Sequence, residues 1–308
     1  MTGRRSENAG RSSLVEMAAT GRVDLQSHSR HSDGDLAAAE VVAAAAAAGV
    51  ELLALSDHDT VDGVDEAIEA AAAHGIGLLT ATEISAVDGG HEDLHILGYG
   101  IDHHDTRLLE RLHSAREDRE ARADRMAALL VAAGYGVDDA PLAAHRAAGK
   151  PVGRPHLAAA VLGHPGNAEQ LAREGHADVT SFIRAYLIPG MPAYAGRTRP
   201  TVGEAIEWIH DAGGLAFWAH PFWDIAEDDE VLAALERHRA AGLDGVECFY
   251  VTHDEHQTTV LWTRAEELGL LRSASSDYHG PDHRLFSRFL AYQLFGGTVA
   301  LGTLTAGA

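Results

Sequence analysis

Short apolar segments alternate with alanine-rich segments along most of the chain, and this pattern predicts strands that alternate with helices. Helices are expected over residues 36–48 and 62–74, because a glycine follows each of these segments directly. Another helix is expected to begin at the capping-box sequence T-V-G-E, residues 201–204, and to end at Gly213. The predicted strands cover residues 22–26, 50–56, 77–82, 93–99, 215–219, 244–249 and 270–275. Repeated strand-helix units predict an α/β fold whose parallel sheet closes into a barrel.

The alternation of strands and helices lapses in the middle of the chain, where the sequence predicts helices alone. These helices cover residues 106–133, 155–162 and 179–187. The chain is therefore predicted to consist of a disordered lead-in, a barrel built from two segments, and a helical insertion or lid. The lead-in covers residues 1–20, the barrel covers residues 21–102 and 201–308, and the insertion covers residues 103–200.

The charge balance and the cysteine content limit the partners and the location of the protein. The 308 residues include 46 acidic and 24 basic side chains, which give a formal net charge of −22. This charge argues against duplex nucleic acid as a partner and favours a soluble monomer or small homo-oligomer. Cys248 is the single cysteine, so an internal disulfide is excluded and a cytoplasmic location is expected. No uncharged apolar run of about 18 residues is present, so no membrane association is predicted.

Histidines and carboxylates occur at or near the ends of the predicted strands. The chain contains 20 histidines, and several of them follow strands directly. In a parallel barrel the carboxyl ends of the strands share one face, so distant residues converge in one pocket. Imidazoles and carboxylates without thiolates suit Zn, Mn or Fe. The residues placed in this way are His28, Asp57, His58, Asp59, Glu83, His95, His220, Glu247, Asp277 and His279.

Seven short motifs identify the family that the chain resembles. They are H-S-R-H-S-D-G from residue 28, A-L-S-D-H-D-T from residue 54, E-I-S from residue 83, H-I-L-G-Y from residue 95, G-R-P-H from residue 153, A-H-P from residue 219 and S-S-D-Y-H-G from residue 275. Together they resemble the PHP family of metal-dependent phosphoesterases over residues 22–302. The resemblance implies a distorted seven-stranded (β/α) barrel with an inserted helical subdomain. Within this family, the chain resembles above all the subgroup that acts on nucleotides, including phosphatases of nucleoside 3′,5′-bisphosphates and a 5′-exonuclease on short RNA.

The resemblance also implies which residues bind metal. It implies two to three divalent ions per chain, either Mn, Zn or Fe, with Glu83 as a bridge between the first and second. The family carries a pair of histidines where this chain has Gln26 and His28. The implied ligands are Gln26, His28, Glu83 and Asp277 for the first metal, Glu83, His95 and His220 for the second, and Asp33, His58 and His279 for the third.

Other residues are expected to contact the substrate. Arg154 and His156 match an R-x-H motif of the family that helps to hold phosphate, and an arginine can grip phosphate with two parallel hydrogen bonds. The resemblance thus implies catalytic roles for Glu83, His220, Arg154 and His156. Substrate binding is assigned to Arg154, His156, Gln26 and Arg197. Three aromatic residues near His220, namely Trp218, Phe222 and Trp223, are interpreted as packing residues rather than as base-stacking residues.

The predicted function is hydrolysis of a phosphate monoester of a small nucleotide, such as a nucleoside 3′,5′-bisphosphate or monophosphate, through a metal-bound hydroxide. Two phosphoesterase alternatives stay open at this point, a 5′-exonuclease on short RNA and a phosphatase of another small phosphorylated metabolite. A third alternative keeps the metals but cleaves a C–N bond, as amidohydrolases do. A fourth is a family member that binds a nucleotide or metal without catalysis, for which Gln26 is the main support.

Overall fold

The computed structural model of the chain describes residues 22–147, 152–196, 200–302 and 304. The predicted lead-in of residues 1–20 lies outside the described residues. The chain divides into two compact units, one made of residues 1–112 with 199–308 and one made of residues 113–198. We call the first the barrel unit and the second the helical unit.

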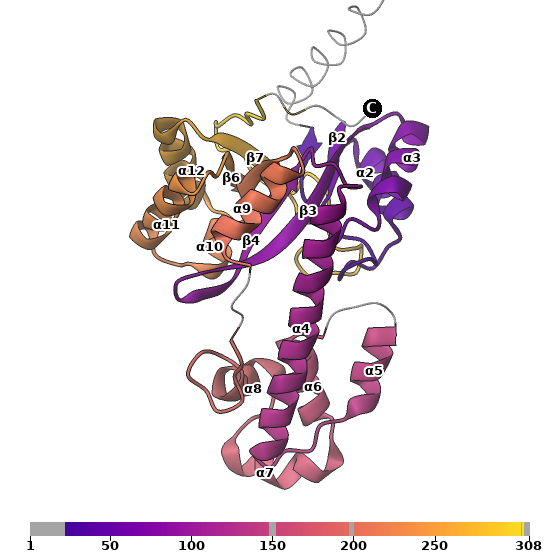
Figure 1. Cartoon of the computed structure of the whole chain (residues 1–308), viewed down its shortest axis with the longest axis vertical. Coiled ribbons are helices and arrows are strands. Elements are labelled where there is room, and N and C mark those ends of the chain that lie inside the picture. Colours follow the sequence, from indigo (N-terminus) through magenta and orange to yellow (C-terminus); the bar gives the residue numbers. More distant parts are fainter. Residues whose placement is uncertain (1–21, 148–151, 197–199, 303, 305–308) are drawn as a thin grey trace, which may run out of the picture. The chain divides into compact units, whose positions relative to one another are not determined.

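A seven-stranded sheet forms the barrel unit, with the strands in the order of the sequence (Figure 1). The strands are β1 (Val23–Asp24), β2 (Leu52–Leu55), β3 (Gly77–Asp88), β4 (His91–Tyr99), β5 (Leu215–Trp218), β6 (Gly245–Tyr250) and β7 (Leu271–Ser275). The first and last strands meet, because Leu25 N donates to Ala274 O at 3.0 Å and His28 N donates to Tyr278 O at 2.8 Å. The sheet therefore nearly closes on itself, which confirms the predicted distorted barrel of seven strands.

The prediction that all strands run parallel is wrong for β4. This strand is antiparallel to both of its neighbours, and its register places Ser85 of β3 opposite His95. The cause is the turn of Gly89 and Gly90 between Asp88 and His91, where Gly89 has a φ of 58°. A turn of two glycines gives a β-hairpin, and a hairpin can only join antiparallel strands. His95 thus reaches the barrel interior from the middle of β4 and not from the carboxyl end of a parallel strand.

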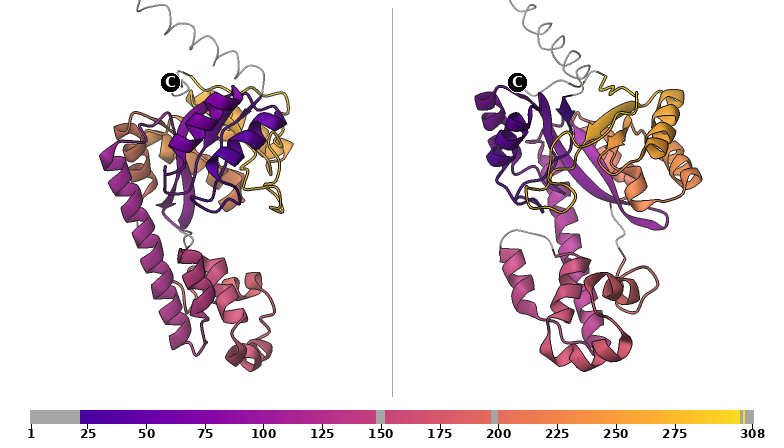
Figure 2. Two further views of the ribbon diagram at one scale, coloured as in Figure 1. Left: turned by 90° about the vertical axis from the view of Figure 1, so that its right-hand side faces the viewer. Right: turned by 180° about the vertical axis from the view of Figure 1, so that it is seen from behind.

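Helices cover the sheet of the barrel unit on two sides (Figures 1 and 2). On one side, next to β2, lie α2 (Ala38–Ala48) and α3 (Val64–His74), which end as predicted at glycines with φ of 85° and 70°. On the other side, next to β6 and β7, lie α11 (Asp228–Ala240) and α12 (Glu255–Leu268). Two further helices are α9 (Val202–Asp211) and the short α10 (Pro221–Asp224). The predicted capping box begins α9, because Thr201 accepts from the backbone of Glu204.

The helical unit contains most of α4 (Thr106–Ala132), which begins in the barrel unit, and four shorter α-helices among its described residues. They are α5 (Asp139–Ala147), α6 (Arg154–Leu162), α7 (Ala168–Glu174) and α8 (Val179–Tyr186), with the 3₁₀ turn η1 (Pro165–Asn167) before α7. The unit has its own hydrophobic core, in which Leu130, Phe182 and Leu187 are fully buried. It is a helical subdomain, and the lid function expected of it stays a prediction.

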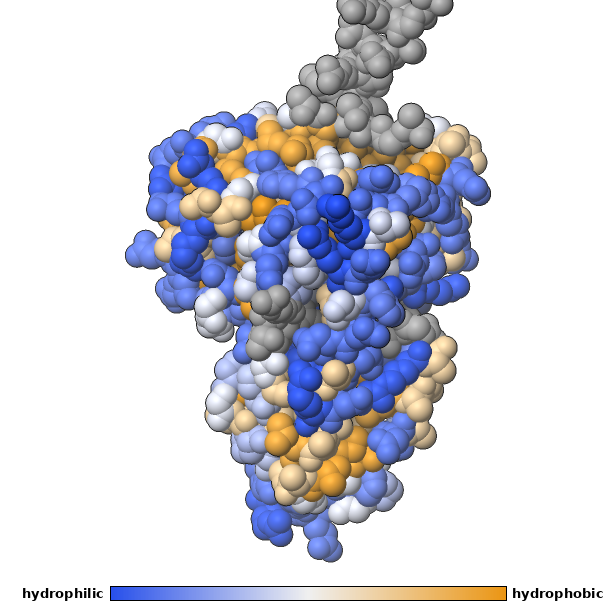
Figure 3. All heavy atoms as spheres, in the orientation of Figure 1, coloured by the Kyte–Doolittle hydropathy of each residue, from blue (hydrophilic) through white to orange (hydrophobic). Residues whose placement is uncertain are grey.

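The surface of the chain is largely polar on the face that Figure 3 shows. This agrees with a charged-residue content of 23%. None of the helices in the described part of the chain is long and apolar enough to cross a membrane.

Candidate metal centre

The barrel unit brings together all eight residues that the sequence analysis predicted as metal-binding histidines and carboxylates. They come from six different connections or strands, so every strand of the barrel except β6 contributes one or two ligands to the same place, directly or through the connection that follows it. The residues are His28 and Asp33 after β1, His58 after β2, Glu83 in β3, His95 in β4, His220 after β5, and Asp277 and His279 after β7. Seven of them form three overlapping groups, and within each group the ligand atoms lie within 4.8 Å of one another. The eighth, His220, lies beside Glu83.

The first group consists of His28, Glu83 and Asp277, all of them buried. The Nε2 atom of His28 lies 3.1 Å from Glu83 Oε2 and 3.0 Å from Asp277 Oδ1. The group contains all the ligands that were predicted for the first metal except Gln26.

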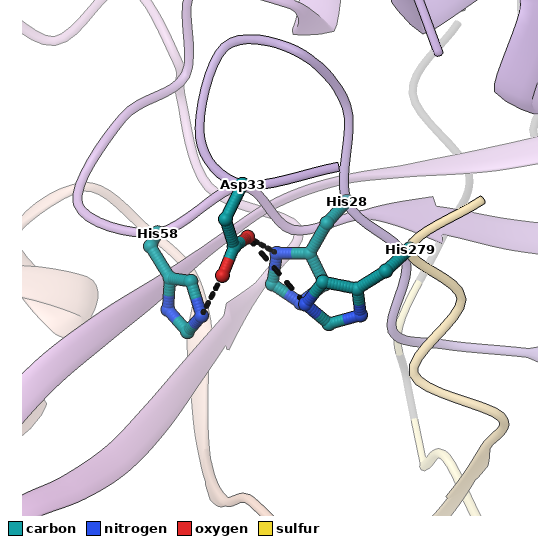
Figure 4. A group of neighbouring side chains, drawn as sticks. All are labelled: His28, Asp33, His58 and His279. Atoms are coloured by element: carbon teal, nitrogen blue, oxygen red, sulfur yellow. Dashed lines mark ion pairs between the residues drawn. The ribbon is translucent and has the colours of Figure 1, made fainter. Parts of the chain in front are cut away.

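The second group surrounds Asp33 and includes three histidines, as Figure 4 shows. The Oδ1 atom of Asp33 lies 3.6 Å from His28 Nδ1 and 3.4 Å from His279 Nε2. Its other oxygen, Oδ2, lies 3.7 Å from His58 Nε2. The group contains the three ligands predicted for the third metal, which are Asp33, His58 and His279, and in addition His28. Because the Asp33 side chain is 50% exposed, this group marks the side of the centre that faces solvent.

The third group consists of His58, Glu83 and His95. Glu83 Oε1 lies 2.8 Å from His95 Nδ1 and 3.1 Å from His220 Nε2. The three ligands predicted for the second metal are therefore also close together. Glu83 Oε2 lies 3.7 Å from His58 Nδ1. Glu83 thus belongs to two of the groups, as a bridging carboxylate requires.

Several ligand atoms in the centre are buried without a hydrogen-bond partner, although buried polar atoms normally have one. Among the described residues, these atoms include His28 Nε2, His58 Nδ1 and Asp277 Oδ1. His28 Nε2 and Asp277 Oδ1 are close to each other, yet the pair lacks hydrogen-bond geometry. Imidazole nitrogens and carboxylate oxygens that lie within 4.8 Å of one another, several of them without a hydrogen-bond partner, fit divalent Zn, Mn or Fe. The residues therefore fit the metal ions that the family implies.

The electrostatics of the centre favour ionised carboxylates. Burial alone raises a carboxyl pKa, but the neighbouring histidines around Asp33 and Glu83 outweigh burial and lower both pKa values well below the usual range. Burial lowers the pKa of His58 to about 4, which keeps its imidazole neutral. For His28, burial is outweighed by the carboxylates of Asp277, Glu83 and Asp33 close to its ring, and its pKa is raised well above the usual value. Metal ions would meet ionised oxygen ligands here.

A layer of hydrogen bonds holds the predicted ligands, and most of these bonds could not be predicted from the sequence. Asp57 accepts from Ser29 N at 2.7 Å and from Ser32 Oγ at 2.6 Å, which orders the loop between His28 and Asp33. In the same loop, a Cβ on Gly34 would lie 2.3 Å from the carbonyl oxygen of His28, so only glycine allows this close approach. The only sequence signal for Asp57 was its place at the end of a strand.

Hydrogen bonds also hold Asp277 and His220, two predicted ligands from the later part of the chain. Tyr250 donates to Asp277 Oδ2 at 2.7 Å, and the backbone N of His220 donates to Glu247 Oε2 at 2.8 Å. Burial raises the pKa of Glu247 to about 8. His220 has a φ of 29° and Asp277 a φ of 53°, values that are unusual for non-glycine residues and are typical of strained functional sites.

Gln26 is fully buried and its amide is used within the centre. Its Nε2 donates to Glu83 Oε2 at 2.8 Å, and its Oε1 accepts from Ser275 Oγ at 3.3 Å. This orientation follows from chemistry, because an ionised carboxylate can only accept. Gln26 therefore holds the central carboxylate, and its expected role in substrate binding stays a prediction.

The remaining predicted substrate residues do not belong to the barrel unit. Arg154 is the first residue of α6, and His156 accepts at Nδ1 from Gly153 N at 3.0 Å. The expected contact of Arg154 and His156 with phosphate stays a prediction. Arg197 lies outside the described residues.

A separate exposed group lies elsewhere on the barrel unit, where Asp65 Oδ1 is 2.9 Å from His103 Nε2 and 3.5 Å from His104 Nε2. This group has no signal at the predicted strand ends, because none of its residues follows a strand directly.

Comparisons with known proteins agree with this geometry. The PHP domain family matches residues 24–212. A 3′,5′-nucleoside bisphosphate phosphatase of Chromobacterium violaceum is 37% identical over 84% of this chain and 87% of its own length. A 5′-3′ exoribonuclease of Haemophilus influenzae is 35% identical over 85% of this chain and 91% of its own length.

Two solved structures are similar over most of their length. One, described as an amidohydrolase from Chromobacterium violaceum with bound sulfate and no metal, has a TM-score of 0.70 and 34% identity, covering 86% of this chain and 90% of its own. The other, described as a metal-dependent phosphoesterase from Bifidobacterium adolescentis, has a TM-score of 0.67 and 25% identity, covering 90% of this chain and 92% of its own.

Proposed function

Because the chain belongs to the PHP domain family and is a metal-dependent phosphoesterase, we propose that it removes a phosphate group from a small nucleotide. The proposed substrate is a nucleoside 3′,5′-bisphosphate or a nucleoside monophosphate. The observation that carries the proposal is the set of three overlapping ligand groups, two of which share the buried carboxylate of Glu83.

The roles of individual residues follow from their positions in the centre. Two or three divalent ions, when bound, would neutralise the phosphate and lower the pKa of the attacking water. Glu83, which belongs to two groups, sets the spacing between two of the sites. The half-exposed Asp33 stands on the side from which substrate would enter. The proton for the departing alkoxide is proposed to come from His156 or from a group near His220.

The nucleotide substrate is supported by the relatives, of which one is named a nucleoside bisphosphate phosphatase. A second candidate function is 5′-3′ exonuclease activity on short RNA, which another relative's name supports. The net charge of −22 favours the small substrate, because a long polyanion would be repelled along its length. C–N hydrolysis is supported only by the description of one similar structure as an amidohydrolase. A monomer or small homo-oligomer in the cytoplasm stays the expectation.

The proposal is tested by measuring phosphate release from the purified full chain reconstituted with Mn, Zn, Fe or Mg. The substrates are nucleoside 3′,5′-bisphosphates, nucleoside monophosphates, 5′-phosphorylated short RNA and ribose 5-phosphate. Release from the bisphosphates or monophosphates at a higher kcat/KM than from the other substrates is the expected result. Nucleotide products released from RNA at a higher kcat/KM would instead favour the exonuclease. Less than one metal per chain after reconstitution would contradict metal-dependent hydrolysis.

Arg154→Lys is expected to lower kcat/KM by about 5- to 160-fold, which is about 1–3 kcal/mol, because lysine keeps the charge but loses the planar fork that grips phosphate. Steady-state kinetics on the best nucleotide substrate measure this change. Arg173→Lys, an exposed substitution on α7, serves as the control. Unchanged kinetics of the Arg154 variant would remove this arginine from the phosphate site.

Gln26→His is expected to increase the metal content per chain and to keep turnover, because an imidazole nitrogen is a better ligand than an amide for Zn or Mn. Elemental analysis and phosphate release measure the two effects, with Gln170→His as a control in the helical unit. If the variant gains metal but no longer hydrolyses nucleotides, Gln26 acts on the substrate and not as a substitute ligand.

A further inference from the structure

A tryptophan at the edge of the metal centre is exposed to an extent that packing does not explain. Trp223 lies in α10, which begins directly after the predicted ligand His220. Its side chain is 50% exposed, while the neighbouring Trp218 in β5 is 1% exposed. Burial of Trp218 agrees with the packing role expected from the sequence. Half of Trp223 remains in contact with water, where a large aromatic surface is available to a ligand.

Trp223 is connected to the metal centre through one buried ring. The ring centroids of Trp223 and Phe286 are 5.6 Å apart, and those of Phe286 and His279 are 5.4 Å apart. Phe286 is 7% exposed and also stacks on His283 at 5.0 Å with an interplanar angle of 10°. The exposed indole is therefore one aromatic ring away from a predicted metal ligand.

The backbone holds this group of rings in place from two sides. On the first side, Trp223 N donates to His220 O at 2.8 Å, and Pro221 begins the helix with its restricted φ. On the second side, His283 Nδ1 accepts from Phe286 N at 3.0 Å, which closes a turn under the aromatic ring. An aromatic surface that is fixed before binding loses little entropy when a planar ligand stacks on it.

We propose that Trp223, supported by Phe286, is the stacking platform for the nucleobase of the substrate. This inference rests on the proposed function, since only a nucleotide places a planar base next to the phosphate that the metal centre receives. Stacking on an aromatic side chain tolerates any base, because every base has a π-face. The exposed Arg284, two residues before Phe286 in the sequence, adds a cation to the segment that carries the platform.

The test compares substrates with and without a base in the full chain. Trp223→Ala is expected to raise KM for a nucleoside monophosphate by about 5- to 160-fold, corresponding to stacking of about 1–3 kcal/mol per base. The kcat of this variant for the nucleoside monophosphate is expected to stay within about twofold of the wild type, and so is its kcat/KM for ribose 5-phosphate, which has no base. Trp223→Phe keeps an aromatic face and is expected to restore most of the affinity. Phe295→Ala removes another exposed aromatic side chain and serves as the matched control.

Two kinetic results would overturn the platform. Unchanged KM for nucleotides in Trp223→Ala would show that the indole does not contact the base. An equal loss on ribose 5-phosphate would show a general effect on the metal centre. A wild type that hydrolyses ribose 5-phosphate but no nucleotide would contradict the proposed function separately. In that case, quenching of tryptophan fluorescence by AMP in the wild type but not in Trp223→Phe would still support the platform, and absence of quenching would refute it.

Discussion

Glu83→Gln is expected to lower kcat for nucleotide hydrolysis by at least about a thousandfold and to reduce the metal content of the purified protein. The substitution keeps the shape of the side chain but removes its charge and one of its two acceptor oxygens. Both oxygens are engaged in the wild type, since Oε1 lies 2.8 Å from His95 and Oε2 lies 3.1 Å from His28. Because Glu83 belongs to two of the three ligand groups, the loss affects more than one metal site.

Elemental analysis and phosphate release on the same preparation measure both effects of Glu83→Gln. Glu69→Gln, an exposed substitution on α3, is the control and should behave like the wild type. A Glu83 variant that retains its metals and more than about a tenth of the wild-type kcat would contradict the role of a bridging carboxylate.

Trp218→Ala is expected to lower the free energy of unfolding of the barrel unit by about 3–5 kcal/mol, because deletion of a large buried aromatic side chain leaves a cavity. Trp218 belongs to the main hydrophobic core, and its ring lies 4.7 Å from that of His238. Urea denaturation followed by circular dichroism measures the change. The large expected loss of stability distinguishes the buried Trp218 from the exposed Trp223 in α10.

Trp223→Ala is the matched control for stability, and its free energy of unfolding should stay within about 1 kcal/mol of the wild type. A similar loss in both variants would mean that Trp223 is also a core residue, which would weaken its assignment as a platform. Wild-type stability of Trp218→Ala would show that the core of the barrel can collapse around the missing ring.

The strands and several helices could be predicted from the sequence because their signals are local. Glycines such as Gly49 and Gly75 end helices in the left-handed conformation, and this requirement is visible without any tertiary contact. The direction of β4 was predicted wrongly although its signal, the pair Gly89 and Gly90, was also local. The general alternation of strands with helices suggested parallel pairing and outweighed a turn that permits only a hairpin.

The predicted metal ligands could be found because strand ends converge on one face in any barrel of this kind. The residues that support them could not, because their partners are determined by the folded chain. Nothing in the sequence around Tyr250 indicates that its hydroxyl donates to Asp277. The buried bond from Gln26 to Glu83 likewise joins residues 57 positions apart in the sequence, which is why the glutamine was interpreted only as a weak ligand.

The closure of β1 onto β7 has a consequence for how the protein is made. Ser275 and Gln26, which bond across this closure, are 249 positions apart in the sequence, and four of the predicted ligands, His28, Asp33, Asp277 and His279, come from the same two regions. Contacts between residues so distant in the chain form late in folding, because a long loop must close before they can stabilise anything. The nascent chain therefore has no complete set of the predicted ligands until β7 and the residues that follow it, Asp277 and His279, have left the ribosome.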